Sequence, residues 1–180
     1  MLTVLYICKG NVLRSPAAEL ITNQELQRRG LDGLVKAESA GLYSMADHDS
    51  GWKREYHPLW KSMARNVRAL GYDTSMHKPP RPASLALLES AAVTLCMEAH
   101  QVKIVEHSLS KQGLPVDGRV ISTIHQFAGH GEKDLVDPYI FSFRFGYRGA
   151  YRQAATEIRQ CVLDIIPKLE ELAHNPKVRR

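Results

Sequence analysis

The chain has few cysteines and no long run of apolar residues. Three cysteines in 180 residues, an odd number at wide spacing, argue against a set of disulfides and agree with a reducing compartment. The apolar run near the N-terminus, residues 2–7, is too short for a secretory leader, and no run approaches the length of a membrane span. These absences exclude a disulfide-rich secreted domain and predict a cytoplasmic protein with no membrane partner.

Metal-binding spacings and dense basic stretches are also missing. The eight histidines and three cysteines form no Cys-x2-Cys pair and no His-Glu-x-x-His stretch, so we expect no metal and no cofactor. The net charge of +5 is spread along the chain, apart from a basic tail at 175–180 that we expect to fray. Nucleic-acid binding would need a denser basic stripe. No repeat or low-complexity segment divides the chain, so residues 1–180 are predicted to form one domain.

The most informative stretch joins the apolar run 2–7 to a helix that we expect to begin at Ser15 or Pro16. It reads Cys8-Lys9-Gly10-Asn11-Val12-Leu13-Arg14-Ser15. Successive backbone N–H groups in a tight loop can form an anion-binding nest, and a helix N-terminus adds unpaired N–H groups and the positive end of its dipole. The sequence therefore predicts a phosphate-binding loop after the first strand, lined by residues 8–15.

Two side chains would give this loop its chemistry. Cys8 lies in the positive field of the loop, which favours the nucleophilic thiolate. Arg14 offers a planar fork that matches two phosphate oxygens at once. Gly10 and Asn11 tolerate left-handed backbone, and Ser15 suits a helix cap. A thiolate that faces a bound phosphate predicts in-line attack at phosphorus and a cysteinyl-phosphate intermediate.

The stretch resembles the signature of the low-molecular-weight protein tyrosine phosphatases, Cys-x-Gly-Asn-x-x-Arg-Ser, which is accompanied by an Asp-Pro late in the chain. The matching residues here are Cys8, Gly10, Asn11, Arg14, Ser15 and Asp137-Pro138. The resemblance implies that Cys8 is the nucleophile, that Arg14 and the loop bind the phosphate, and that the substrate is phosphotyrosine in proteins. It further implies that Ser15 stabilises the leaving thiolate.

Asp137-Pro138-Tyr139 is the second chemical feature. A positioned carboxylic acid can protonate the leaving oxygen of a phosphate ester, an effect of roughly 10²–10⁴-fold, and its carboxylate can then activate water. Pro138 biases Asp137 toward extended backbone. The resemblance implies this acid and base role for Asp137, with Asp134 as the nearest competitor, and suggests that Tyr139 forms a wall of the substrate slot.

Further residues gain roles only through the resemblance. Ser39, in the Ser39-Ala40-Gly41 stretch that ends the second strand, would brace Asn11. His77 would support the loop through asparagine and serine hydrogen bonds. Residues 42–58 correspond to a specificity loop, here longer than is usual in the family. Tyr43 or Trp52 could form an aromatic wall in it, and the sequence leaves that choice open.

Three alternative functions stay open. A threonine after the loop asparagine accompanies arginine-phosphate hydrolysis in resembling proteins, so the apolar Val12 favours phosphotyrosine over a protein arginine phosphatase. An arsenate reductase on the same fold is suggested by Thr94-Leu95-Cys96, which resembles a thiol relay, but no cysteine follows up to Leu114 and an external thiol would be needed. A non-catalytic phosphate-binding module is the alternative of another class.

The remaining pattern predicts a single α/β domain. We expect helices over 15–29, 60–70, 84–90, 101–109 and 148–173, strands over 2–7, 34–39, 91–97 and 120–121, and a loop over 128–137. A small parallel sheet of about four strands, with helices on both faces, would place the site at the carboxyl ends of the strands. Pro167 should kink or locally break the last helix. The sequence leaves the oligomeric state open.

Overall fold

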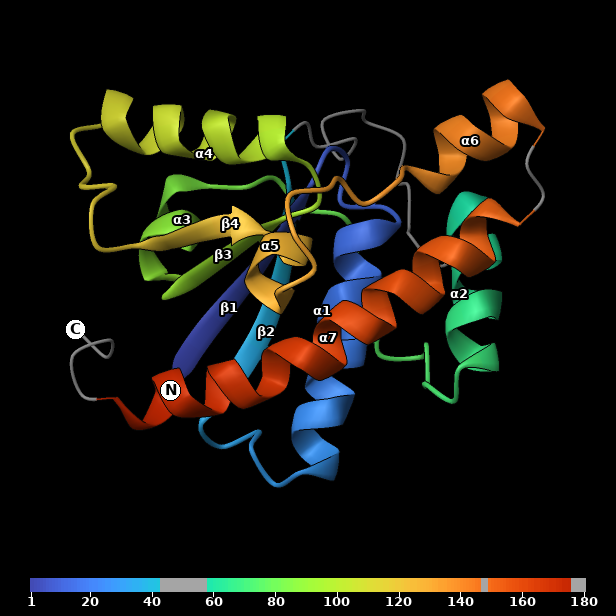
Figure 1. Cartoon of the computed structure of the whole chain (residues 1–180), viewed down its shortest axis with the longest axis horizontal. Coiled ribbons are helices and arrows are strands. Elements are labelled where there is room, and N and C mark those ends of the chain that lie inside the picture. Colours follow the sequence, from blue (N-terminus) through green and yellow to red (C-terminus); the bar gives the residue numbers. More distant parts are fainter. Residues whose placement is uncertain (43–57, 147–148, 176–180) are drawn as a thin grey trace.

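The predicted parallel sheet is confirmed. The computed structural model describes residues 1–42, 58–146 and 149–175. Its sheet has four strands in the order β2-β1-β3-β4, all parallel (Figure 1). The strands are β1 Leu2–Cys8, β2 Val35–Gly41, β3 Val93–Cys96 and β4 Val120–Thr123. The carboxyl ends of the strands therefore meet at one edge, where Cys8 lies opposite Gly41 in the β1–β2 register.

All five predicted helices are present, with ends shifted by a few residues, and two more occur. The helices are α1 Arg14–Arg28, α2 Pro58–Ala69, α3 Leu85–Ser90, α4 Ala99–Lys111, α5 Ile124–Ala128, α6 Pro138–Phe145 and α7 Ala150–His174. The sequence analysis missed α5 and α6. Helix α5 has five residues, too few to show an apolar periodicity, and is bounded by a Thr123 cap and by Gly129 at φ 89°.

The two faces of the sheet bury different helices, because side chains alternate along β1. Leu5 and Ile7 pack with residues of α3 and α4, such as Leu88 and Val105. The opposite face of β1, which includes Tyr6, packs on α1, α2, α5 and α7. Figure 1 shows α3 and α4 on one side of the sheet and α1 and α7 on the other. The sheet is thus a buried platform that fixes where its carboxyl edge lies.

Two details of the helices differ from expectation. Helix α1 begins at Arg14 rather than at Ser15 or Pro16, and Leu13 is the cap residue. The Ser15 hydroxyl does not cap the helix, because it is hydrogen-bonded to Cys8 instead. Pro167 does not break helix α7, which continues to His174, and the predicted kink stays a prediction. Pro167 faces solvent, while Ile165, Ile166 and Leu169 are buried around it. Their burial offsets the cost of about 3 kcal/mol that a helix-interior proline carries.

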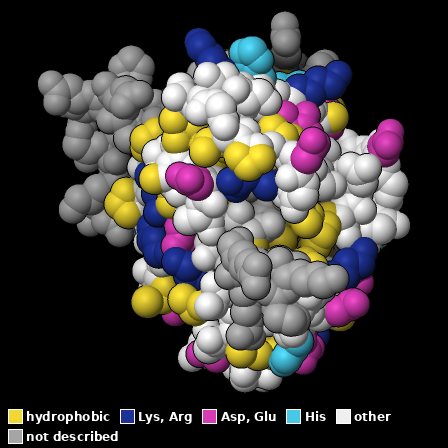
Figure 2. Space-filling model, turned by 90° about the vertical axis from the view of Figure 1, so that its left-hand side faces the viewer, with side chains coloured by type: hydrophobic (Ala, Val, Ile, Leu, Met, Phe, Trp, Pro, Cys, Tyr) yellow, Lys and Arg dark blue, Asp and Glu magenta, His cyan; other side chains and the backbone are white. Residues whose placement is uncertain are grey.

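The surface carries both signs of charge. Figure 2 shows Lys and Arg side chains interspersed with Asp and Glu and with apolar groups on the face it presents. In the parts of the chain that the structure describes, no helix has the length and apolar character that a membrane span requires.

Candidate active site

The nucleophile candidate lies at the end of the central strand β1. The Cys8 side chain is buried, and its sulfur accepts two hydrogen bonds. One comes from the backbone N–H of Asn11 at 3.2 Å and the other from the Ser15 hydroxyl at 3.0 Å. Two donors on one sulfur stabilise its anionic form. The structure thus brings Cys8 and Ser15 together as the sequence analysis expected, although Ser15 belongs to the first turn of α1.

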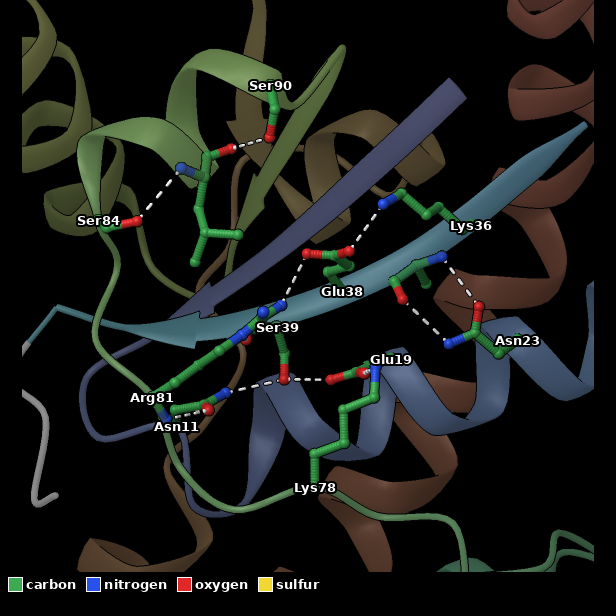
Figure 3. Close-up of polar contacts among 12 residues, drawn as sticks. Asn11, Glu19, Asn23, Lys36, Glu38, Ser39, Lys78, Arg81, Ser84 and Ser90 are labelled. Carbon is green, nitrogen blue, oxygen red and sulfur yellow. Dashed lines mark hydrogen bonds and ion pairs between the residues drawn. The ribbon is translucent and has the colours of Figure 1, made fainter. Parts of the chain in front are cut away.

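Asn11 fixes the shape of the loop. Its backbone is left-handed at φ 52°, a conformation that asparagine tolerates better than most residues. Its side chain is fully buried and its amide nitrogen donates to the hydroxyls of Ser39 at 2.8 Å and Ser15 at 3.0 Å. Its amide oxygen accepts the backbone N–H of Arg81 at 3.0 Å. The bonds to Ser39 and Arg81 tie the loop to the end of β2 and to the segment after α2 (Figure 3).

A charge network with a buried carboxylate at its centre backs this loop, and the sequence analysis missed it. The carboxylate of Glu19, on α1, accepts hydrogen bonds from Ser39 at 2.5 Å and from the Lys78 ammonium at 2.7 Å. The guanidinium of Arg81 donates to the Ser39 carbonyl and to Glu38, each at 2.8 Å (Figure 3). A buried carboxylate with two partners holds the Ser39 hydroxyl in place. Glu19 lies four residues after Ser15, so helical spacing could have placed it near the loop.

His77 was expected to support the loop directly. The structure describes its Nδ1 in a hydrogen bond with the Thr74 carbonyl at 2.8 Å, and its ring lies 5.3 Å from that of Trp60. Among the described contacts from this segment, the backbone N–H of Arg81 bonds Asn11 directly. The role of His77 therefore stays a prediction, and Arg81 is a supporting residue that the sequence analysis did not name.

Gly41 is needed because the loop passes directly over it. A Cβ atom at this position would lie 2.9 Å from the backbone nitrogen of Asn11 and 2.9 Å from the carbonyl carbon of Gly10. Both neighbours are backbone atoms, so only a shift of the loop could relieve the overlap. This close approach explains the glycine of the Ser39-Ala40-Gly41 stretch.

The Gly41→Ala variant is expected to displace the loop and to lose at least about tenfold in kcat/KM, with a loss of roughly 1–3 kcal/mol in the free energy of unfolding. Steady-state kinetics and urea unfolding measure the two effects. Gly33→Ala is the matched control, because a Cβ there meets nothing within 4 Å. Equal behaviour of the two variants would contradict the close approach.

Arg14 is almost completely buried and has three described acceptors. Its guanidinium donates to the Leu135 carbonyl at 2.7 Å and to Asp137 at 2.9 Å, and it forms an ion pair with Glu98. A buried guanidinium needs such partners, because an unpaired charge in the interior is costly. Glu98 follows β3 and was not recognised as a site residue. The three acceptors fix the plane of the Arg14 fork at the carboxyl edge of the sheet.

The structure separates the two candidate acids. One carboxylate oxygen of Asp137 caps α6 by accepting the Tyr139 N–H at 3.0 Å, and the other contacts Arg14. Asp134 is exposed and accepts the N–H of Ala99 at 2.7 Å at the start of α4. Of the two candidates, Asp137 is therefore the one that the structure brings to Arg14.

Tyr139 lies beside Asp137 on the first turn of α6. The residue is 42% exposed, and its ring stacks on that of Phe143, with ring centroids 5.7 Å apart. A ring that stays open to solvent next to the candidate acid fits the predicted wall of a substrate slot. The other two candidates for that wall, Tyr43 and Trp52, lie outside the described residues.

The two other cysteines are poor nucleophiles. Cys96 is fully buried in β3, and burial raises the pKa of its thiol far above the usual range. Burial also raises the pKa of Cys161, on α7, to about 12. Since the thiolate is the reactive form, Cys96 does not fit the relay role that the arsenate reductase alternative would give it.

Comparison with known proteins identifies a family for the chain. Residues 3–175 match the family model described as low molecular weight phosphotyrosine protein phosphatase. The low molecular weight protein-tyrosine-phosphatase YfkJ of Bacillus subtilis is 48% identical over 42 residues, which are 23% of this chain and 27% of that protein. A protein-arginine-phosphatase of the same organism is 22% identical over 169 residues, or 93% of this chain and 97% of that one. The chain thus spans about a quarter of the first relative and nearly all of the second.

Solved structures have the same fold. A low molecular weight protein tyrosine phosphatase from T. tengcongensis matches with a TM-score of 0.69 at 26% identity, covering 93% of this chain and 99% of that one. A YwlE mutant from Bacillus subtilis matches with a TM-score of 0.73 at 20% identity, covering 94% and 99%. Because the family model spans almost the whole sequence, the chain belongs to the low molecular weight phosphotyrosine protein phosphatase family.

Proposed function

We propose that this protein hydrolyses phosphotyrosine in protein substrates through a cysteinyl-phosphate intermediate. The proposal rests on one observation: three groups meet at the carboxyl edge of the sheet. The Cys8 sulfur receives two hydrogen bonds, the buried Arg14 lies six residues later in the same loop, and Arg14 contacts Asp137. These groups supply a nucleophile, an oxyanion site and a proton donor.

In the first step the Cys8 thiolate attacks phosphorus in line with the ester oxygen. The S–P bond forms and the P–O bond to the substrate breaks. Asp137 gives its proton to the departing oxygen, which leaves as the neutral tyrosine hydroxyl. Arg14 and the backbone N–H groups of the loop hold the equatorial oxygens, where charge is stabilised throughout the transfer.

In the second step water attacks the cysteinyl-phosphate. The Asp137 carboxylate takes a proton from that water, the new O–P bond forms and the S–P bond breaks. Cys8 leaves as a thiolate, and the hydrogen bonds from Ser15 and from the Asn11 N–H stabilise it. The products are inorganic phosphate and the free enzyme, so the protons balance over the cycle.

Two observations favour phosphotyrosine. The loop side chain at Val12 is apolar and cannot hydrogen-bond a guanidinium. Tyr139 comes two residues after the candidate acid Asp137 and is exposed. Its ring can therefore stack on a phosphotyrosine ring. The second candidate, a protein arginine phosphatase, is supported by the match of 93% of this chain to a protein of that name.

Matched peptides that carry either phosphotyrosine or phosphoarginine would separate the two candidates. We expect phosphotyrosine to be hydrolysed with at least about tenfold higher kcat/KM, and Val12→Thr to shift the ratio toward phosphoarginine by a few-fold. A wild type that prefers phosphoarginine would overturn the assignment. If a folded, reduced enzyme hydrolysed neither peptide, arsenate reduction with an external thiol would be assayed next.

A further inference from the structure

Two histidines and a cysteine meet between α5 and α7, outside the catalytic loop. His125 lies on α5, His130 follows that helix and Cys161 lies on α7. One ring nitrogen of each histidine and the Cys161 sulfur all lie within 4.8 Å of one another. The proposed phosphatase reaction uses none of these side chains.

In each of the two histidines, one ring nitrogen contacts a hydrogen-bond acceptor that lies outside the cluster. Nδ1 of His125 lies 3.1 Å from the Lys133 carbonyl, which can only accept, so Nδ1 carries the proton and Nε2 keeps a lone pair when the ring is neutral. Nε2 of His130 lies 2.9 Å from the Asp164 carboxylate, which leaves the lone pair on Nδ1. Metal-binding histidines characteristically donate their other N–H to a carboxylate or a backbone carbonyl. Both rings therefore make the supporting hydrogen bond that is characteristic of metal-binding histidines.

The remaining nitrogen of His125 faces a second acceptor. Its Nε2 lies 3.1 Å from a carboxylate oxygen of Glu157, which also accepts the Lys133 ammonium at 2.8 Å. The side chain of His125 has no exposed surface, so this contact lies inside the protein. An imidazole nitrogen and a carboxylate oxygen are both atoms that bind Zn²⁺, so one cation can contact this nitrogen and this oxygen together.

The distance between Cys161 and His130 fits a shared metal. Bonds of about 2.3 Å to sulfur and about 2.0–2.1 Å to nitrogen at the tetrahedral angle place the two ligand atoms roughly 3.5–3.6 Å apart. The Cys161 sulfur and His130 Nδ1 are 3.6 Å apart. Imidazole and thiolate ligands together favour zinc over magnesium or calcium.

We propose that His125, His130 and Cys161 bind one Zn²⁺ ion, and that Glu157, which contacts Nε2 of His125, supplies an oxygen for the fourth position. Cys161 would give its proton to solvent as the metal binds. The sequence analysis expected no metal, because the chain has no Cys-x2-Cys pair and no His-Glu-x-x-His stretch. His125, His130 and Cys161 belong to neither pattern. Topology alone brings these side chains together.

The ion would hold the segment that carries the catalytic acid. His130 precedes Asp137 by seven residues, and the intervening Leu135 donates its N–H to the Met97 carbonyl while its own carbonyl accepts from Arg14. A metal bridge from His130 to α7 would fix the start of this segment. The site would thus stabilise the protein and steady Asp137 without touching the substrate.

Zinc binding to the untagged, reduced Cys8→Ser protein tests the proposal, since this parent lacks the catalytic thiol as a competing ligand. We expect one Zn²⁺ per chain by competition with a chromophoric chelator, and a higher melting temperature with zinc. His130→Gln and Cys161→Ser should each weaken binding by at least about tenfold and remove the zinc-dependent shift. His107→Gln, at an exposed position of α4, should bind as the parent does.

Cobalt gives a second readout, because a Co²⁺–thiolate bond adds a charge-transfer band that should disappear in Cys161→Ser. His130 is exposed, so His130→Gln keeps the test valid if Cys161→Ser does not fold. A parent without stoichiometric zinc, or variants that bind zinc as the parent does, would overturn the proposal. The contact between His125 and Glu157 would then be an ordinary buried ion pair.

Discussion

Replacing Cys8 with serine is expected to lower kcat for p-nitrophenyl phosphate by at least about 10⁴-fold. A serine hydroxyl at this position stays protonated, so the two hydrogen bonds that Asn11 and Ser15 direct at the sulfur no longer stabilise an anionic nucleophile. Serine differs from cysteine by one atom, and the loop bonds around Asn11 should persist. Steady-state kinetics at pH 5 to 7 measure the loss.

Two controls separate lost chemistry from lost structure. The Cys8→Ser protein should still bind inorganic phosphate, because Arg14 and the loop amides remain. Cys96→Ala should keep most of the activity, since that buried thiol lies in β3 and takes no part in the proposed reaction. Turnover by Cys8→Ser within about tenfold of the wild type would contradict the role of Cys8 as nucleophile.

Asp137→Asn is expected to lower kcat for a phosphotyrosine peptide by roughly 10²–10⁴-fold. The amide cannot protonate the phenolic oxygen, although its own oxygen can still cap α6 through the Tyr139 N–H. The loss should be smaller for p-nitrophenyl phosphate, because p-nitrophenolate leaves readily without a proton. Comparing the two substrates in one variant therefore isolates the proton-donor role from a general disturbance of the site.

Asp134→Asn is the matched control for this substitution. Asp134 is three residues away in sequence, but it caps α4 through Ala99 instead of contacting Arg14. Its replacement should change kcat by no more than a few-fold. If Asp134→Asn proved as damaging as Asp137→Asn for the phosphotyrosine peptide, the assignment of the acid would be wrong.

The candidate catalytic loop could be predicted from the sequence because its residues are close together in the chain. Cys8, Asn11, Arg14 and Ser15 lie within eight residues, so a strand, a tight loop and a helix suffice to bring them together. The sheet could be predicted because its pattern is also local: short apolar runs separated by helical patterns favour parallel strands. Even here the first turn differed, because Ser15 bonds the Cys8 sulfur rather than capping the helix.

The residues that contact the loop from elsewhere in the chain could not be predicted from the sequence, because their contacts depend on long-range packing. Glu98 reaches Arg14 only after β3 has taken its place beside β1, and Arg81 reaches Asn11 across 70 residues. The sequence analysis gave no role to Glu19, which the structure buries against Ser39.

Helix α6 was missed because its sequence has no polar face. Four of its apolar residues are each at least 40% exposed: Tyr139, Ile140, Phe141 and Phe143. The spacing of apolar residues therefore does not mark a buried face in this helix, as it does in most surface helices. The Asp137-Pro138 pair does fit a helix start, with a capping carboxylate followed by proline at the first position. That signal was assigned to catalysis alone, although the structure shows that the residue also caps the helix.

Trapping the phosphorylated enzyme tests the central claim most directly. The Asp137→Asn variant should break down the intermediate slowly, because it also lacks the base that activates water. Rapid acid quench after mixing with p-nitrophenyl phosphate, followed by intact-mass and peptide analysis, is predicted to show one phosphoryl group on Cys8 and none on a Cys8→Ala, Asp137→Asn protein. A phosphoryl group on another residue, or turnover with no covalent adduct at any quench time, would contradict the account.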